Sequence, residues 1–235
     1  MKFKFSKAIL AVLALVAVVG LLPLQSQALT TYTTRSSMPS NDYVDWATLP
    51  PFPDNITTYS HIFSVPVTTS NPGNSLQIRV QPGNWGGNFA PGDFLLFTGI
   101  GTPIGIGFSP LEIAFGTDVF AAGAQIQTDG FGAFTATIQA FDASHTSLGS
   151  YTRSDGYSTS AGDNSAIFLG VSDPSRPIRF LEFTAVYHIP DQYPSYTYAI
   201  NRLDISTTAA VPLPGSLLLL GSGLMGLIVN RRKLS

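Results

Sequence analysis

The chain has 235 residues and no cysteine, which excludes disulfide bonds, thiolate nucleophiles and cysteine-based zinc sites. Its net charge of −2 hides an uneven distribution, because residues 29–230 carry six arginines, no lysine and all 14 acidic residues, a net charge of −8. Nucleic acids are bound through cations that replace phosphate counterions, so this acidic body predicts no nucleic-acid partner.

Residues 1–28 have the three parts of a secretory signal peptide. Three lysines lie within the first seven residues, the run 8–22 is unbroken and apolar, and Pro23 ends it. Ser26 and Ala28 place small residues at the two positions that a signal peptidase reads. An uncleaved anchor is the alternative, although the run is shorter than the ~20 residues that span a bilayer. We expect an N-terminal signal helix that signal peptidase removes after Ala28, and therefore an exported protein.

The body that follows has the pattern of an all-β domain. Residues 29–53 are rich in Thr, Ser and Pro, and we expect an extended lead-in there. From 54 to 208, short runs of alternating apolar and polar residues recur between Gly, Pro, Asn and Asp, as in half-buried strands joined by turns. Ten such runs lie at 61–67, 75–81, 93–99, 111–116, 119–127, 134–140, 148–154, 166–172, 179–189 and 196–205. With no amphipathic helix among them, they predict an antiparallel β-sandwich of jelly-roll type.

Part of this body also resembles a known group of domains. The stretch 111–205 contains the phrases LEIAFGTDVFAAGAQIQ, GAFTATIQAFDASHTSLGSYT and YAINRLDI. These resemble galactose-binding and carbohydrate-binding-module-like β-sandwich domains, with His145 where a turn glycine is expected and Asn201 in place of an aspartate of the last strand. The resemblance implies a sandwich fold and an extracellular polysaccharide as a ligand.

A tryptophan in a glycine-rich loop is the candidate glycan-binding residue. Trp85 lies in the sequence PGNWGGNFAPGD, where a large ring is difficult to bury. An exposed ring can stack on a sugar face, with Asn84 and Asn88 as hydrogen-bonding neighbours. The alternative is that the ring folds back and caps the sandwich.

Oxygen-bearing residues near the strands suggest a structural calcium ion as the only cofactor. Jelly-roll modules of the kind that the chain resembles often tie an early strand to the last one through oxygen ligands, which suit Ca²⁺. Asp118, Asn201 and Asp204 are the residues that we assign to such a site. The alternative is that they are solvated turn residues.

No motif of the body identifies a reaction. The three histidines have no metal-ligand spacing, no G-x-S-x-G sequence is present, and the acidic residues are scattered. We therefore predict that the protein is not an enzyme. A jelly-roll carbohydrate-active enzyme is the alternative.

The last residues, VPLPGSLLLLGSGLMGLIVNRRKLS, combine two prolines, an apolar run and a basic tail. As a helix, the run 216–229 would rise about 21 Å, short of the ~30 Å hydrocarbon core of a bilayer. The tail Arg231, Arg232 and Lys233 would stay in the cytoplasm by the positive-inside rule, which places the body outside the cell. This topology agrees with that of the N-terminal signal.

The order of these parts, in residues 211–235, resembles the PEP-CTERM sorting signal of Gram-negative bacteria. The motif is Val211, Pro212, Leu213 and Pro214, with leucine where the family has glutamate. The resemblance implies a C-terminal transmembrane helix that anchors the precursor, and an exosortase that cleaves near the prolines. A plain membrane-anchored surface protein without processing is the alternative. We expect a structural or adhesive protein of the cell surface or exopolysaccharide matrix, with glycan binding.

Overall fold

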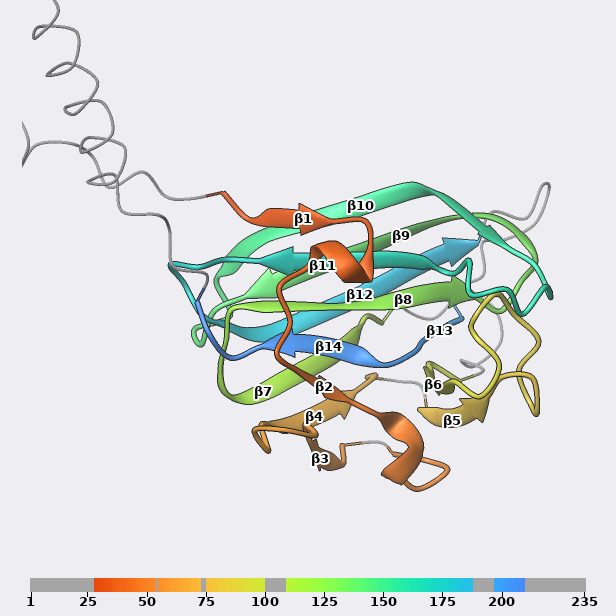
Figure 1. The fold of residues 1–235 in the computed structure, drawn as a ribbon, viewed down its shortest axis with the longest axis horizontal. Coiled ribbons are helices and arrows are strands. Elements are labelled where there is room, and N and C mark those ends of the chain that lie inside the picture. Colours follow the sequence, from red (N-terminus) through yellow and green to blue (C-terminus); the bar gives the residue numbers. More distant parts are fainter. Residues whose placement is uncertain (1–27, 54, 73–74, 100–108, 188–196, 210–235) are drawn as a thin grey trace, which may run out of the picture.

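The computed structural model describes residues 28–53, 55–72, 75–99, 109–187 and 197–209. Two antiparallel sheets pack face to face (Figure 1). Helix is confined, within these residues, to the 3₁₀ turns η1 (Arg35–Ser37) and η2 (Trp46–Thr48). None of the helices described is long and apolar enough to cross a membrane. The predicted all-β sandwich is confirmed, while the signal helix and the C-terminal hydrophobic helix lie outside the described residues.

The first sheet, sheet A, has eight strands. Its main path runs in the spatial order β1 (Thr30–Tyr32), β11 (Ile167–Ser172), β8 (Ala121–Thr128), β13 (Tyr198–Ile200), β6 (Phe94–Phe97) and β5 (Gln77–Val80). Strand β14 (Leu203–Ser206) follows β13 along the same edge of β8 and also pairs with β2 (Asp42–Val44). The central strand β8 therefore has β11 on one side and both β13 and β14 on the other.

The second sheet, sheet B, has six strands in one continuous path. Their spatial order is β10 (Ser147–Ser158), β9 (Gly132–Phe141), β12 (Ile178–Tyr187), β7 (Leu111–Val119), β4 (Pro66–Ser70) and β3 (Thr57–Tyr59). Strand β9 shows why its sequence forms a half-buried strand, because Phe134 and Ile138 are buried while Thr135 and Thr137 are not. The alternation expected from the sequence is confirmed there.

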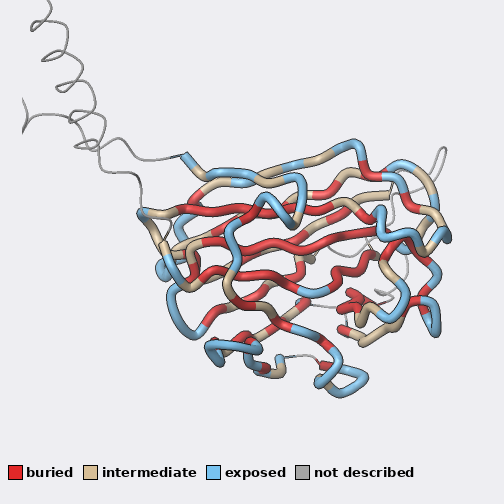
Figure 2. The backbone as a smooth tube through the Cα atoms, in the orientation of Figure 1, coloured by how far each residue is buried: buried red, intermediate tan, exposed pale blue. Residues whose placement is uncertain are grey.

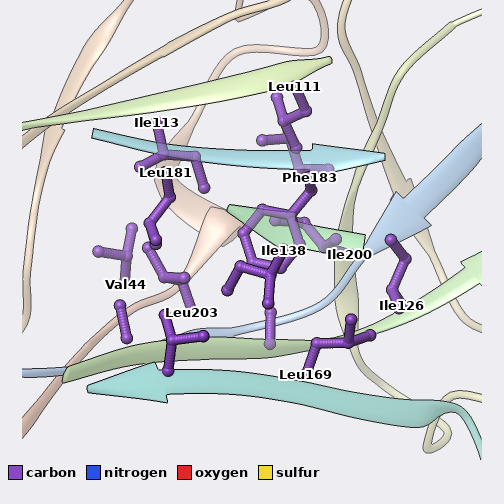
Figure 3. Packing of buried hydrophobic residues seen from close by; sticks show 14 of the residues in the cluster. Val44, Leu111, Ile113, Ile126, Ile138, Leu169, Leu181, Phe183, Ile200 and Leu203 are labelled. Atoms are coloured by element: carbon purple, nitrogen blue, oxygen red, sulfur yellow. The ribbon is translucent and has the colours of Figure 1, made fainter. Parts of the chain in front are cut away.

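The main core lies between the two sheets, where apolar side chains from both inner faces meet (Figure 3). Sheet B contributes Phe183 and Ile138, and sheet A contributes Ile126, Leu169 and Ile200. All five side chains are completely buried. Burial of this interior provides the main free energy of folding, since each such side chain contributes about 1.5–3 kcal/mol.

The segment 29–53 is part of the sandwich, contrary to the expected lead-in. Strand β1 pairs with β11, β2 pairs with β14, and Val44 and Trp46 are completely buried. The predicted start of the domain at residue 54 is therefore wrong. The Thr/Ser/Pro-rich composition concealed these strands, because three residues are too few to show an alternating pattern.

Sheet A is covered on its outer face as well, so that all eight residues of β8 are buried (Figure 2). Leu95 and Phe97 of β6 point away from the main core and pack with Trp85 and Phe89 of the preceding loop. A smaller cluster, Met38, Ala121 and Phe168, covers the other part of the same face. Segments that look like surface loops in the sequence thus form a second apolar layer.

Both ends of the described sandwich lie at one pole. Thr30 of β1 is opposite Ser172, Ser172 is opposite Ala121, and Ala121 is opposite Ser206 of β14. The four residues form one row across sheet A, which separates the first and last strands by three strand spacings, about 14 Å. In Figure 1, β1 begins and β14 ends on the same side of the molecule.

Asp42 fixes the loop that follows β3. Its buried carboxylate accepts hydrogen bonds from the Ser60 hydroxyl and from the backbone N–H groups of Tyr43, Ile62 and Phe63. Burial alone would raise the pKa of Asp42, but the hydrogen bonds from Ser60, Phe63, Ile62 and Tyr43 outweigh it and lower the pKa. The ionised form therefore stabilises the fold.

Substituting Asp42 with asparagine should make the protein less stable at neutral pH and less sensitive to acid. A lowered pKa in the folded state gives a contribution that is complete above the unfolded pKa of about 3.9 and lost as the pH falls through the folded value. We expect Asp42→Asn to lower the free energy of unfolding by about 1–3 kcal/mol at pH 7. Urea unfolding from pH 7 to pH 3 measures both effects.

Asp118→Asn is the matched control for this experiment. The Asp118 side chain is 57% exposed and lies 3.6 Å from Arg179 in a surface ion pair. Such a pair contributes about 0–1 kcal/mol, so stability should change little. Equal acid sensitivity of wild type and Asp42→Asn would contradict the role assigned to Asp42.

Candidate functional site

A line of polar side chains crosses the outer face of sheet A. It starts from Gln125 and Gln127, which alternate along β8 with the inward-facing Ala124 and Ile126. Both amides are buried between the strand and the loops that cover it. Buried polar groups require hydrogen-bond partners, so these two residues determine which polar groups gather above the sheet.

Asn201 is the centre of this line. It lies between β13 and β14, where its side-chain oxygen accepts the backbone N–H of Gln125 at 3.1 Å and so replaces a missing backbone partner. The same oxygen accepts a bond of 2.9 Å from Arg35. Its side-chain nitrogen donates to Gln125 Oε1 at 2.7 Å and to Asp93 Oδ2 at 2.9 Å. All four hydrogen-bonding positions of this amide are used.

Asp204 lies between two arginines at the edge of the same line. Arg35 Nε is 2.6 Å from its Oδ2, and Arg202 Nη2 is 2.9 Å from its Oδ1. The Asp204 side chain is only 4% exposed. Burial raises the pKa of Asp204, against the opposing effect of the two guanidinium groups. Arg202 in turn lies over the ring of Tyr43, 4.8 Å from its centroid.

Beside this polar line, the surface is hollowed to a volume of about 520 Å³. Most of the residues that line it carry hydroxyl, amide or guanidinium groups, and Ala166, Ile167 and Phe168 add apolar surface. It consists of Thr33, Thr34, Arg35, Ser36, Gln125, Arg153, Asn164, Ser165, Ala166, Ile167 and Phe168. These residues come from η1 and the turn before it, from β8 and β10, and from the start of β11 and the loop before it. The size is within the range of sites for small organic ligands, about 300–1,000 Å³.

The predicted glycan-binding group at Trp85 is not available on the surface. The Trp85 ring is 6% exposed and packs against Phe97 and Phe89, with ring centroids 5.2 Å and 6.4 Å away. The side chain of Asn84 accepts the backbone N–H of Val80 at 2.6 Å. The alternative reading, a ring that folds back over the sandwich, agrees with the structure. Leu95 and Phe97 face outward and provide the apolar surface that buries it.

Asn88 is also a structural residue and not a free hydrogen-bonding neighbour. Its side-chain nitrogen donates to the hydroxyls of Thr159 and Ser165, each at 2.8 Å. Its side-chain oxygen accepts the backbone N–H of Thr159 at 2.6 Å and Nε2 of Gln127 at 3.0 Å. The residue is 3% exposed and connects two loops to β8.

The three residues assigned to calcium do not come together. Asn201 and Asp204 are neighbours through Arg35, but Asp118 lies on β7 in the other sheet and pairs with Arg179. The guanidinium groups of Arg35 and Arg202 hold the Asp204 carboxylate that a cation would need. The calcium site expected from the sequence is therefore not formed by these residues, because arginine supplies the positive charge.

Four residues of the hollow, Arg35, Gln125, Arg153 and Asn164, had not been singled out from the sequence. One signal for them existed. The run VFAAGAQIQ has glutamine at alternate positions of an otherwise apolar strand, which indicates polar partners above that face. The partners themselves come from distant parts of the chain and leave no local pattern.

Comparison with protein families assigns the C-terminus. A model of the PEP-CTERM protein-sorting motif matches residues 210–233. The chain carries a PEP-CTERM motif. The motif implies processing by an exosortase and thus an exported, membrane-anchored precursor. Val211, Pro212, Leu213 and Pro214, and the tail Arg231, Arg232 and Lys233, fall within the match and outside the described residues.

The PEP-CTERM match begins four residues after the last strand, which ends at Ser206. It therefore covers none of the sandwich. No curated protein and no solved structure matches the chain.

Proposed function

We propose that this protein is exported and placed on the cell surface or in the exopolysaccharide matrix by an exosortase. In this proposal signal peptidase removes residues 1–28, the C-terminal helix holds the precursor in the membrane, and exosortase cleaves near Pro212 and Pro214. The observation that carries the proposal is the PEP-CTERM motif directly after a closed sandwich. The sandwich is the part that would reach the surface.

The arrangement of the two chain ends supports this route. Thr30 and Ser206 lie in one row at one pole of sheet A, close to the two sites where we expect cleavage. Cleavage after Ala28 precedes β1, and cleavage after residue 210 follows β14. Neither event removes a strand, so the sandwich keeps its whole core after processing.

The mass of the mature protein tests this proposal. Protein recovered from the surface or medium of the producing bacterium should lack residues 1–28 and most of the chain after Val211. Changing both Pro212 and Pro214 to alanine should leave the C-terminal segment on the protein in the membrane fraction. Intact mass spectrometry with C-terminal peptide mapping measures both results.

Abundant full-length C-terminal peptides in the mature wild-type pool would contradict exosortase processing. They would favour a plain membrane-anchored surface protein. As a control, changing Ser150 to alanine on the exposed face of β10 should leave both mature termini unchanged and lower the mass only by the one oxygen atom removed.

We further propose that the sandwich acts by binding, in a structural or adhesive role, and not by catalysis. A glycosidase requires two carboxyl groups that face each other across the substrate. The residues that line the hollow include no Asp or Glu, and the nearby carboxylates of Asp204 and Asp155 are paired with Arg35, Arg202 and Arg153. Such an arrangement supports recognition of a ligand by hydrogen bonds.

A further inference from the structure

We propose that the hollow on sheet A binds a sugar unit of an extracellular polysaccharide through the groups of Thr33, Arg35, Ser36 and Asn164. This inference rests on the proposed function, because an extracellular polysaccharide is the ligand that a matrix protein would meet. The proposed sugar site is about 13 Å from the pole that holds the chain ends. Phe168 in the hollow lies opposite Gln125, which is four residues along β8 from Ala121 at that pole.

The Phe168 ring of the hollow lies close to the sheet because two glycines face each other there. Gly123 of β8 is opposite Gly170 of β11, and a Cβ on either would lie 2.6–2.7 Å from atoms of the Phe168 ring. The ring therefore lies directly on the backbone of the sheet. The Arg35 guanidinium lies 5.9 Å from the centre of this ring, which keeps the arginine beside the hollow.

The two rims of the hollow, at Thr33 and at Asn164, are held in place by hydrogen bonds from side chains of strands β10 and β8. Arg153 of β10 donates to the backbone oxygens of Thr33 and Phe168, each at 3.3 Å. Gln125 of β8 donates to the backbone oxygen of Asn164 at 3.3 Å and to its side-chain oxygen at 3.1 Å. Each rim is thus fixed by a side chain from a strand. This reduces the conformational entropy that the rims would lose when a ligand binds.

The groups left free in the hollow are mainly hydrogen-bond donors. Within the described residues, the Nδ2 of Asn164, the Nη1 of Arg35 and the hydroxyls of Thr33 and Ser36 make no hydrogen bond, although other atoms of Asn164 and Arg35 do. A site of donors without a carboxylate suits a ligand rich in acceptors. Sugar hydroxyl, ring and carboxylate oxygens have this chemistry.

Two variants test the assignment. In the first, Thr33→Val, Ser36→Ala and Asn164→Asp are combined, which removes three sets of donors. Aspartate keeps the side-chain oxygen that Gln125 binds and tolerates the left-handed backbone of residue 164, where φ is 61°. In the second, Ser36→Trp places a ring in the hollow without removing a contact of the fold.

The matched control carries Thr135→Val and Ser150→Ala on the outer face of sheet B. These positions lie on β9 and β10, neither of them lines the hollow, and their side chains make no hydrogen bond among the described residues. The control therefore removes hydroxyl groups of the same kind from a surface that we do not assign to binding.

Binding is measured with purified full-length proteins on immobilised exopolysaccharide isolated from the producing strain. We expect at least a tenfold higher Kd for the triple variant and for Ser36→Trp, a wild-type Kd for the control, and the same melting temperature for all proteins. A wild-type Kd for both hollow variants overturns the inference. An equal loss of binding in the control overturns it as well.

The outcome is separable from that of the sorting proposal. The binding assay does not depend on whether the C-terminal segment has been removed, and the mass of each mature variant is measured independently. A correctly processed protein whose hollow variants bind like wild type disproves the site alone. A full-length mature protein whose hollow variants lose binding disproves processing alone.

Discussion

Replacing Trp46 with alanine should lower the free energy of unfolding by about 3–5 kcal/mol, among the largest losses that a single substitution in this chain would cause. The ring is completely buried, and its Nε1 donates to the backbone oxygen of Asn201 at 2.8 Å. Alanine would remove the ring from the main core and leave that oxygen without its partner. Equilibrium unfolding in urea measures the change.

One further variant separates the contribution of the ring from that of its hydrogen bond, and a second serves as a control. Trp46→Phe keeps most of the buried ring but loses the bond to Asn201, and should cost about 1–3 kcal/mol. Phe52→Ala is the control, because Phe52 lies in the same segment and is 66% exposed. Its effect should stay within ~0.5 kcal/mol. If Trp46→Ala and Phe52→Ala had equal effects, the segment 29–53 would not belong to the fold.

Replacing Asp204 with alanine should cost about 3 kcal/mol, because it leaves two guanidinium groups without their carboxylate at the edge of sheet A. We expect the lower end of the range for broken buried pairs, since the side chains of Arg35 and Arg202 are 30% and 43% exposed and water screens them in part. Thermal and urea unfolding at neutral pH measure the loss.

Asp155→Ala provides the comparison for Asp204. Asp155 also pairs with an arginine, at 2.6 Å from Arg153 Nη2, but its side chain is 66% exposed. The exposed pair should contribute only about 0–1 kcal/mol. A loss for Asp155→Ala as large as that for Asp204→Ala would show that burial is not what distinguishes the two ion pairs.

The sequence predicted the parts of the fold that depend on local alternation. The runs 134–140 and 179–189 alternate over enough residues to mark one apolar face. The first lies within β9, and the described part of the second, 179–187, forms most of β12. His145 shows that the sequence also predicted a detail of one turn. It stands where a turn glycine was expected, and its φ of 55° shows that the backbone there does adopt the left-handed conformation that glycine favours.

The covering of sheet A could not be predicted in the same way. Trp85 appeared to be an exposed ring because its neighbours in sequence are glycine and asparagine. Its neighbours in space are the outward-facing residues Leu95 and Phe97 of β6. From an alternating sequence pattern alone, such outward-facing positions would be expected to contact solvent. A sheet with apolar residues on both faces shows a nearly continuous apolar run, as in FLLF, and this was the available sign of a second layer.

The candidate site could not be predicted from local sequence patterns either, because its contacts join distant parts of the chain. Arg35 bonds to Asn201, 166 residues away in the chain, and Arg153 bonds to Thr33, 120 residues away. Neither contact has a spacing that could be recognised in a sequence. The hollow exists because the chain passes over sheet A at its start and the strand β10 reaches the same edge much later.

The place of β14 within sheet A has a mechanical consequence. A precursor held by its C-terminal segment is pulled at Ser206, along the axis of a strand that pairs with both β2 and β8. Its hydrogen bonds are perpendicular to the strand, so they carry the tension together, in shear, and do not open one at a time. A precursor tethered at this end would thus transmit tension into the middle of its sheet, where the hydrogen bonds of β14 to both neighbours resist its extraction.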